Sequence, residues 1–529
     1  MRDIQFPGRS VVHAVNGAAA TSNPLSTLTA IDILRAGGNA VDAAVAACAV
    51  QCVIEPMSTA IGGDCFMLYQ KGGAGPVAGI NGSGWAPAGL TAESLLERGI
   101  REIGPESAES VTVPGAVDAW CTILEAHGTM GMDRVLQPAI ACAENGFAVG
   151  EITQRLWTGR LDGLRGNAAA SALYLKDGAP PRTGDVWRSP ALAQTLRTIA
   201  ERGRDGFYAG PVLDHMLAAL QAVGGVHTEE DFALQRCEPV VPLASTYRGR
   251  TVLEIPPNGG GITAQIMLNI LEGFDLSGLD PMGTERLHLE VEAQRLAYAQ
   301  RNAHVADQRH SDVPVDRLLS KDFAAELRGR IRRDRAMGAL PPAGGPQHKD
   351  TVYLTVVDRD LNCVSFINSV FWSFGSCIAS EETGVVFQNR GGGFVVEPGH
   401  PNCVGPRKRP LHTIIPGMVL NGGECELSFG VMGGPYQPVG QTHVITNLLD
   451  FGMDIQQAID CPRVFHDSGA IVAETSVPEA AVAGLRALGH SVVTAESPLG
   501  GGQGILIDRE RGVLSAGSDP RRDGCALGY

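Results

Sequence analysis

A break in composition near residue 340 constrains this chain more than any other feature. The stretch 339–347 reads ALPPAGGPQ, and proline and glycine at this density can form neither the interior of a helix nor a central strand. From Thr351 onward the residues alternate, with Val352, Leu354 and Val356 on one face, as in a half-buried strand. The sequence therefore predicts a loop that leads directly into a strand whose first residue carries a hydroxyl group.

Charge and size exclude several classes of protein. The chain has 529 residues and a formal net charge of −15, whereas partners such as nucleic acid or anionic membranes require a basic surface. The length suffices for one large domain or two ordinary ones. With 67 glycines and only 5% aromatic residues, the composition favours closely packed layers of helix and sheet in an enzyme-sized protein.

Cysteine and histidine usage argues against disulfides and metals. The twelve cysteines include no CxxC pair, so we expect reduced thiols. The 13 histidines include no HExxH motif and no zinc-like spacing, so we expect no catalytic metal and no cofactor. The segment 1–8 has no apolar core of a signal peptide, and no later run is long enough to span a bilayer. These features predict a cytoplasmic protein with no membrane partner.

Hydrophobic periodicity gives the main elements. One helix is expected to start at Pro24, and a second, from Ala40 to about Val53, is apolar on nearly every side and so predicted to be buried. A long charged helix from about Thr284 to Ala306 is expected to expose its Glu, Arg and Gln side chains to solvent. The strand at Thr351 and a second from Cys363 to Phe371 predict a hairpin.

Thr351 is a candidate nucleophile for a reason that follows from its place in the chain. Cleavage of the preceding bond, between Asp350 and Thr351, would leave a threonine with a free amine. Such a residue holds its nucleophile and its general base together.

Several short motifs in a fixed order resemble the γ-glutamyltranspeptidase family of N-terminal nucleophile hydrolases. They are Gly37-Gly38-Asn39-Ala40-Val41-Asp42, Asp350-Thr351, Phe374-Gly375, Gly405-Pro406-Arg407-Lys408-Arg409-Pro410, Gly433-Gly434 and Cys461-Pro462-Arg463. The resemblance covers nearly the whole chain. It implies a self-cleaving precursor with a large subunit (1–350) and a small subunit (351–529). Together they would form one catalytic α+β domain, a four-layer αββα sandwich.

The resemblance also assigns catalytic roles. Thr351 would be the nucleophile, and its freed amine, with an ordinary pKa of roughly 7.7 to 8.0, could accept the hydroxyl proton. Ser369 stands where the family has a hydroxyl bonded to the nucleophile. Gly433 and Gly434 match the family's oxyanion hole, in which two backbone N–H groups face the developing negative charge.

The residues that hold the glutamyl group in transpeptidases are largely replaced here. Ser83 stands for an arginine that binds the α-carboxylate, and Gly393 for an aspartate that binds the α-amino group. Phe371 replaces an asparagine, and His412-Thr413 replaces a pair of serines. Each lost charged hydrogen bond costs roughly 1.5–3 kcal/mol, so glutathione is expected to be a poor donor.

Bulk and two cationic candidates remain in the predicted pocket. Phe371, Trp372 and Trp85 supply the bulk, while Arg390 and His412 could each anchor a carboxylate. Arg390 could instead form an ordinary ion pair, and His412 could be a structural histidine. The hypothesis that follows is hydrolysis of a small amide acid such as oxamate through an acyl-enzyme.

Three alternatives stay open at this stage. The chain could be a γ-glutamyl hydrolase or transpeptidase that acts on glutathione-like donors, or an acylase for bulkier acyl amides of the cephalosporin-acylase kind, without a lid. It could also be an unprocessed homologue that only binds a ligand. The expected partners are the amide substrate and the two subunits of one precursor. The assembly of processed units is open, and a dimer of heterodimers is one arrangement considered.

Overall fold

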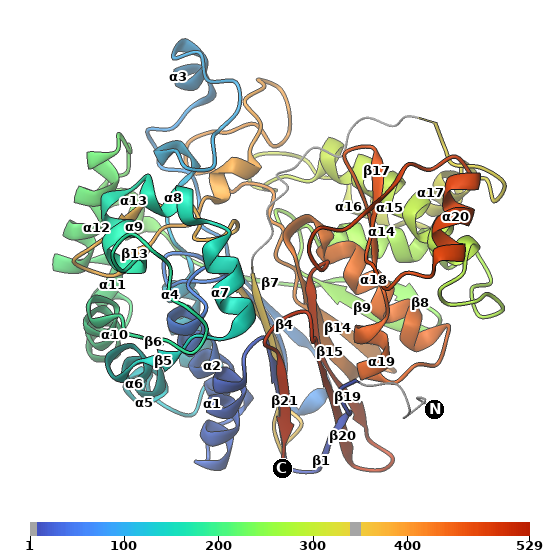
Figure 1. The fold of residues 1–529 in the computed structure, drawn as a ribbon, viewed down its shortest axis with the longest axis horizontal. Helices are drawn as coiled ribbons and strands as arrows, with labels where there is room; N and C mark the ends of the chain where they lie inside the picture. The colour runs from blue at the N-terminus through green and yellow to red at the C-terminus, as the bar shows by residue number, and fades with distance from the viewer. Residues whose placement is uncertain (1–7, 339–350) are drawn as a thin grey trace.

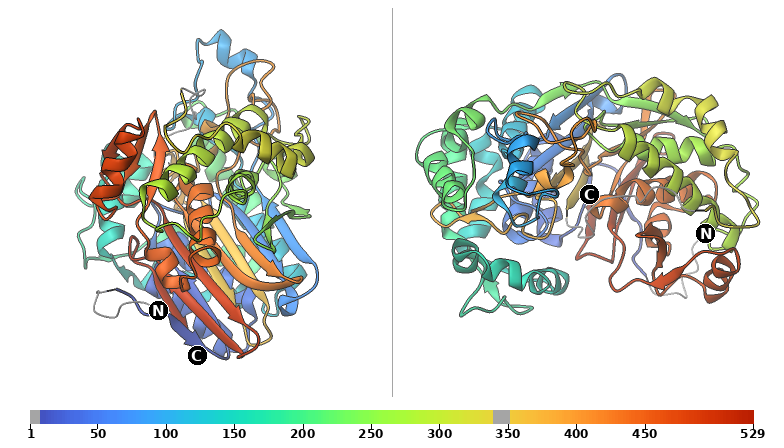
Figure 2. Two further views of the ribbon diagram at one scale, coloured as in Figure 1. Left: turned by 90° about the vertical axis from the view of Figure 1, so that its right-hand side faces the viewer. Right: turned by 90° about the horizontal axis from the view of Figure 1, so that it is seen from above.

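The computed structural model describes residues 8–338 and 351–529. Two sheets lie face to face, and helices cover the outer face of each (Figure 1). Seen from above, the same layers follow one another across the molecule (Figure 2, right). This arrangement confirms the predicted αββα sandwich. No helix in the described ranges combines the length and the apolar character that crossing a membrane requires, and all twelve cysteines are free thiols.

The first sheet contains the strand that begins after Thr351. In spatial order its strands are β21 (Cys525–Gly528), β2 (Ala18–Thr21), β10 (Val352–Val357), β11 (Cys363–Ser369), β3 (Asp64–Gln70), β4 (Val77–Gly82) and β7 (Glu238–Val240). The β10–β11 pair is the predicted hairpin, and its register pairs Val352 with Asn368. In the turn, Asp358 accepts hydrogen bonds from the backbone N–H groups of Asp360 and Asn362, both at 3.0 Å.

The second sheet packs against the first through a layer of apolar side chains that includes Tyr353, Ile367, Met418 and Ile505. Its strands, in spatial order, are β1 (Val12–Ala14), β20 (Val513–Ser518), β19 (Gly501–Asp508), β15 (Glu424–Met432), β14 (Gly417–Asn421), β9 (Arg250–Glu254) and β8 (Leu243–Tyr247). Both sheets combine strands from residues 8–338 with strands from residues 351–529, so the two predicted subunits share one core.

The helical layer on the first sheet is built around α2. Its helices are α1 (Pro24–Arg35), α2 (Ala40–Ile54), α4 (Ala116–His127), α5 (Met132–Val135), α6 (Gln137–Asn145), α7 (Glu151–Thr158), α8 (Leu161–Arg165), α9 (Ala168–Tyr174), α10 (Pro190–Arg202), α11 (Asp205–Tyr208), α12 (Pro211–Ala222) and α13 (Glu229–Leu234). Every residue of α2 is buried, as predicted. Its start is fixed by Asn39, whose side chain accepts hydrogen bonds from the N–H groups of Val41 and Asp42.

The other helical layer lies on the second sheet. Its helices are α14 (Ile262–Leu271), α15 (Thr284–His304), α16 (Val315–Leu319), α17 (Lys321–Arg328), α18 (Gln437–Leu449) and α19 (Ile455–Asp460). The prediction that α15 presents a solvated charged face was wrong. Arg286, Glu290 and Glu292 are at most 2% exposed, because α18 packs against Arg286 and Glu290 and a separate unit covers the helix on another side. That unit comprises β16 (Val464–Asp467), β17 (Ala470–Ala473), α20 (Glu479–Ala487) and β18 (Val492–Thr494).

The remaining elements are short and lie outside these layers. They are α3 (Ala92–Glu97), β5 (Phe147–Ala148), β6 (Val186–Trp187), β12 (Ala379–Ser380) and β13 (Val385–Val386), with the 3₁₀ helices η1 (Lys71–Gly73), η2 (Ala108–Ser110), η3 (Arg390–Gly393) and η4 (Gly434–Tyr436). Of these, η3 and η4 carry predicted site residues.

Candidate active site

Thr351 lies at the start of the central strand β10, where it is only 2% exposed. Its Oγ1 is 3.1 Å from the Oγ of Ser369, the last residue of the neighbouring strand β11. Antiparallel pairing places Val352 opposite Asn368, which brings Thr351, just before β10, beside Ser369, the last residue of β11. The hairpin therefore places the two predicted hydroxyl groups within hydrogen-bonding distance.

Ser369 is held by two further donors. The backbone N–H of Phe371 donates to its Oγ at 2.9 Å, and Nη2 of Arg390 donates at 3.2 Å. Two donors directed at one hydroxyl oxygen leave its proton able to reach Thr351 Oγ1. Ser369 can thus act as a donor toward the predicted nucleophile.

Arg390, in η3, connects this pair to the predicted pocket. It is fully buried, and its Nη1 donates to Thr413 Oγ1 at 2.8 Å. Its guanidinium carbon lies 4.2 Å from the centroid of the Phe371 ring, a distance typical of a cation–π contact. Burial lowers the pKa of Arg390 to about 9, although the nearby charge of Asp64 acts in the opposite direction.

His412 is buried and faces a carboxylate that the sequence analysis did not assign to the site. Its Nε2 is 3.0 Å from Asp64 Oδ2, and its Nδ1 accepts from the N–H of Ile414 at 3.3 Å. The proton therefore resides on Nε2. Burial, together with the charge of Arg390, lowers the pKa of His412 to about 3 against the opposing effect of Asp64, so the ring is neutral at ordinary pH.

Asp64 organises the base of this region. Its Oδ1 accepts from Gly84 N–H at 2.9 Å, from Gly115 N–H at 3.2 Å and from Gln388 Nε2 at 2.8 Å. The signal in the sequence was the Gly62-Gly63 pair directly before Asp64, the first residue of β3. The remaining predicted residue, Ser83, is fully buried and accepts a hydrogen bond from Asn258 Nδ2 at 3.0 Å.

The Gly433–Gly434 pair follows β15 of the second sheet. Gly433 has φ +123° and Gly434 has φ +53°, both in the region that favours glycine. A Cβ at Gly433 would also lie 2.9 Å from Gly500 Cα. The turn leads into η4 and then α18, so its N–H groups lie at a helix start, where partial positive charge accumulates.

A cavity of about 630 Å³ adjoins these groups. Phe371, Gly393, Thr413 and Pro435 line it, and so does Arg301 from α15. Arg390 is not among its lining residues, since it packs against the Phe371 ring. A smaller cavity beside it is lined by Gly434, His412, Thr413 and Arg301. The two cavities share Thr413, Arg301 and Pro435 and thus extend from Phe371 to Gly434.

Arg301 is a pocket residue that sequence reasoning missed, because its helix was predicted to be solvated. Its guanidinium carbon lies 4.2 Å from the centroid of the Tyr298 ring, and its Nε donates to Asn302 Oδ1 at 2.9 Å. The Tyr298 hydroxyl donates to the carbonyl of Pro435. Arg301 and Tyr298 therefore brace the turn that follows Gly434.

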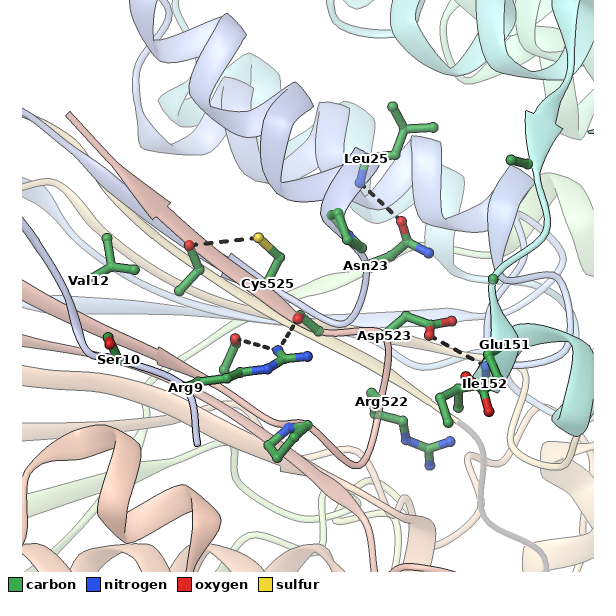
Figure 3. Close-up of a pocket in the computed structure, with 17 residues that line it drawn as sticks. Arg9, Ser10, Val12, Asn23, Leu25, Glu151, Ile152, Arg522, Asp523 and Cys525 are labelled. Carbon is green, nitrogen blue, oxygen red and sulfur yellow. Dashed lines mark hydrogen bonds between the residues drawn. The ribbon is translucent and has the colours of Figure 1, made fainter. Parts of the chain in front are cut away.

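A larger cavity, of about 870 Å³, lies elsewhere (Figure 3). The chain ends and α7 form its wall, with Arg9 donating to Ser518 Oγ at 3.0 Å and Asp523 accepting from Thr153 N–H at 3.2 Å. None of the site residues predicted from the sequence lines it. The volume of a cavity alone therefore does not identify the candidate active site in this molecule.

Comparison with known proteins gives a consistent result. Residues 26–529 match the family model described as gamma-glutamyltranspeptidase. The chain is 36% identical to the glutathione hydrolase-like YwrD proenzyme of Bacillus subtilis, over 94% of this chain and 95% of that protein. It is 34% identical to the oxamate amidohydrolase proenzyme of Klebsiella pneumoniae, over 98% and 99%.

A solved structure extends this to three dimensions. The cephalosporin acylase from Bacillus halodurans superposes with a TM-score of 0.93 at 38% identity, covering 100% of this chain and 99% of that one. The match spans both sheets and both helical layers. The chain therefore belongs to the γ-glutamyltranspeptidase family and is an N-terminal nucleophile hydrolase that acts on amide carbon–nitrogen bonds.

Proposed function

We propose that the chain cleaves itself between Asp350 and Thr351 and then hydrolyses carboxylate-bearing amides through an acyl-enzyme on Thr351. The observation that carries this is the 3.1 Å contact between Thr351 Oγ1 and Ser369 Oγ at the start of the central strand. Asp350 itself lies outside the described residues. The names of the Klebsiella and Bacillus subtilis relatives both contain the word proenzyme, which supports the processing step.

The chemistry follows from these groups. Thr351 Oγ1 attacks the amide carbonyl while the freed α-amine takes its proton, and Ser369 donates a hydrogen bond to the attacking oxygen. The N–H groups of Gly433 and Gly434 stabilise the oxyanion. Collapse of the tetrahedral intermediate breaks the C–N bond, and the leaving amine receives the proton. Water, deprotonated by the same α-amine, then hydrolyses the ester.

The first candidate substrate is a small amide acid such as oxamate. The loss of the glutamyl-binding residues at Ser83, Gly393 and Phe371 supports this choice over glutathione-like donors. Arg390 remains the candidate anchor for the carboxylate, whereas His412 is neutral and both its ring nitrogens are occupied, by Asp64 Oδ2 and by the N–H of Ile414. Arg390 does not line the cavity, and its guanidinium packs on the Phe371 ring, which does, so a direct contact would require side chains there to move.

A second candidate is a bulkier acyl amide, and the volume of the cavity favours it. About 630 Å³ is far more than oxamate fills and lies in the range of pockets that hold drug-sized ligands. Arg301 in its wall would offer a cation to an anionic group on such a substrate.

Mass spectrometry and substrate comparison test the proposal. Wild-type protein is expected to yield two fragments, one ending at Asp350 and one beginning at Thr351, while Thr351→Ala stays intact and loses activity by more than roughly a thousandfold. A wild-type chain that remains a single band on long incubation would refute processing.

The processed enzyme is then assayed for ammonia release from oxamate, for cleavage of larger carboxylated acyl amides and for γ-glutamyl anilide hydrolysis. A clear preference for the glutamyl compound would overturn the reading of Ser83 and Gly393, even if processing occurs.

A further inference from the structure

Three buried residues with metal-binding side chains meet outside the catalytic region. His288 and Glu292 lie one turn apart on α15, and His490 faces them from the segment between α20 and β18. His288 Nδ1 is 2.8 Å from His490 Nε2, which in turn is 3.9 Å from Glu292 Oε1. One ligand atom from each residue lies within 4.8 Å of the other two.

These separations are close to those of a tetrahedral zinc site. Zinc binds imidazole nitrogen and carboxylate oxygen at about 2.0–2.2 Å, which places its ligand atoms roughly 3.3–3.5 Å apart. The observed distances of 2.8 Å and 3.9 Å lie on either side of this value. Side-chain shifts of about half an ångström would suit these two contacts to one ion.

The hydrogen bonding of His288 suits a role as a metal ligand. Its Nε2 donates to the backbone carbonyl of Arg332 at 2.7 Å, which leaves Nδ1 without a proton and directed at the other two residues. Metal-binding histidines commonly donate their second N–H to a carbonyl in this way. The Nε2 of His490 lies 2.8 Å from this Nδ1 and donates its proton to it, and it would exchange that proton for a bound cation.

The charges around Glu292 limit which ion fits. Arg295 Nη1 donates to Glu292 Oε1 at 2.8 Å, and Met337 N–H donates to Oε2 at 3.0 Å. A carboxylate has about four lone-pair positions and can still bind a cation, but Arg295 opposes ions held by charge alone. Two imidazoles favour zinc over Mg²⁺ or Ca²⁺, which prefer oxygen ligands.

We propose that His288, Glu292 and His490 form a binding site for a zinc-class divalent ion with a structural role. The site lies on α15 thirteen residues before Arg301, roughly 20 Å along the helix, so the ion would not touch substrate. It would fasten α15 to the segment between α20 and β18, where Leu488 O already accepts a hydrogen bond from Ala336 N–H at 2.7 Å. The proposal is independent of the substrate and of processing.

Titration of chelator-treated protein with ZnCl₂ tests the site. The wild type is expected to bind one zinc ion per chain by calorimetry, and zinc is expected to raise its unfolding temperature by several degrees. His490→Asn should lose both effects, while His215→Asn, which alters an exposed histidine on α12, should keep both. Mg²⁺ at the same concentration should have no effect.

Cobalt(II) gives a second readout that needs no variant. Wild-type protein with one equivalent of Co²⁺ is expected to show the intense visible absorption of a tetrahedral nitrogen- and oxygen-ligated ion. The competing outcome is that His288 and His490 form a hydrogen-bonded pair that binds no metal. The wild type would then show no saturable zinc binding and no such Co²⁺ spectrum, which would overturn the proposal.

Discussion

Two buried charged clusters in this molecule differ in what neutralises their charge. On α15, Arg286 Nη1 lies 2.8 Å from Glu290 Oε2, and His443 from α18 lies 3.1 Å from Oε1. In the candidate active site, Arg390 donates hydrogen bonds to the hydroxyl groups of Ser369 and Thr413. Both arginines are buried, so burial alone does not separate them. They differ in the groups that they contact: Arg286 contacts a carboxylate, whereas Arg390 contacts neutral hydroxyl groups.

The pKa shifts express the same difference. Burial alone would raise the pKa of Glu290, but the charges of Arg286 and His443 outweigh it and lower the pKa. Burial lowers the pKa of Arg390 to about 9, and Asp64 offsets this only in part. We infer that the first cluster stabilises the fold, whereas the second keeps an incompletely compensated cation next to reactive groups, a pattern typical of functional sites.

The largest effect on stability is expected from Glu290→Gln. Removing one partner of a buried ion pair leaves Arg286 without its carboxylate, which costs about 3–5 kcal/mol of the free energy of unfolding. Denaturant titration measures it, and activity per folded molecule should stay near that of the wild type. Glu285→Gln, in a pair with Arg333 that is 39% and 58% exposed, is the matched control and should cost less than about 1 kcal/mol. Equal losses in the two variants would remove the contrast between buried and exposed pairs.

Arg390→Gln should have the opposite effect to Glu290→Gln, lowering the catalytic rate more than the stability. Losing the charged hydrogen bonds to Ser369 and Thr413 is expected to lower kcat by roughly 10- to 100-fold, equivalent to about 1.5–3 kcal/mol. If Arg390 acts through Ser369, kcat falls with little change in KM, whereas a substrate anchor would raise KM. Arg182→Gln, at an exposed position, is the control. An unchanged kcat and KM would show that the Arg390 contacts do not serve catalysis.

The smallest effect concerns pH. Because the folded state lowers the pKa of Glu290, its contribution to stability is fully present above the unfolded value of about 4.3 and is lost as pH falls through the folded value. Unfolding free energies measured from about pH 7 down to about pH 3 should therefore fall more steeply in the wild type than in Glu290→Gln. Parallel curves would argue that Glu290 does not couple to folding.

Local signals in the sequence predicted the centre of the molecule well. Alternation after the Pro/Gly-rich stretch predicted the β10–β11 hairpin, and the resemblance placed Ser369 against Thr351, whose hydroxyl oxygens lie 3.1 Å apart. The helix from Ala40 was correctly predicted to be buried because every face is apolar. These features depend on residues that are close in sequence or on unbroken hydrophobicity.

Distant pairs account for what was missed. Asp64 and His412 are 348 residues apart, and Arg286 and His443 are 157 apart. A charged helix is predicted to be solvated when the residues that pair with its charges lie elsewhere in the chain. The burial of α15 was therefore missed, and so was the place of Arg301 in the pocket wall. Charge pattern along one helix cannot reveal a second covering layer.

The interleaving of strands in the first sheet affects how the processed protein would unfold and refold. β10 pairs with β2 and β11 pairs with β3, so each flanking strand comes from the other side of the proposed cut. Once cut, the two chains could separate only by dismantling the sheet. Refolding would then need a bimolecular encounter, which slows on dilution, whereas the uncut chain refolds as one molecule. The processed protein would thus be long-lived because its unfolding is slow, rather than because it can readily refold.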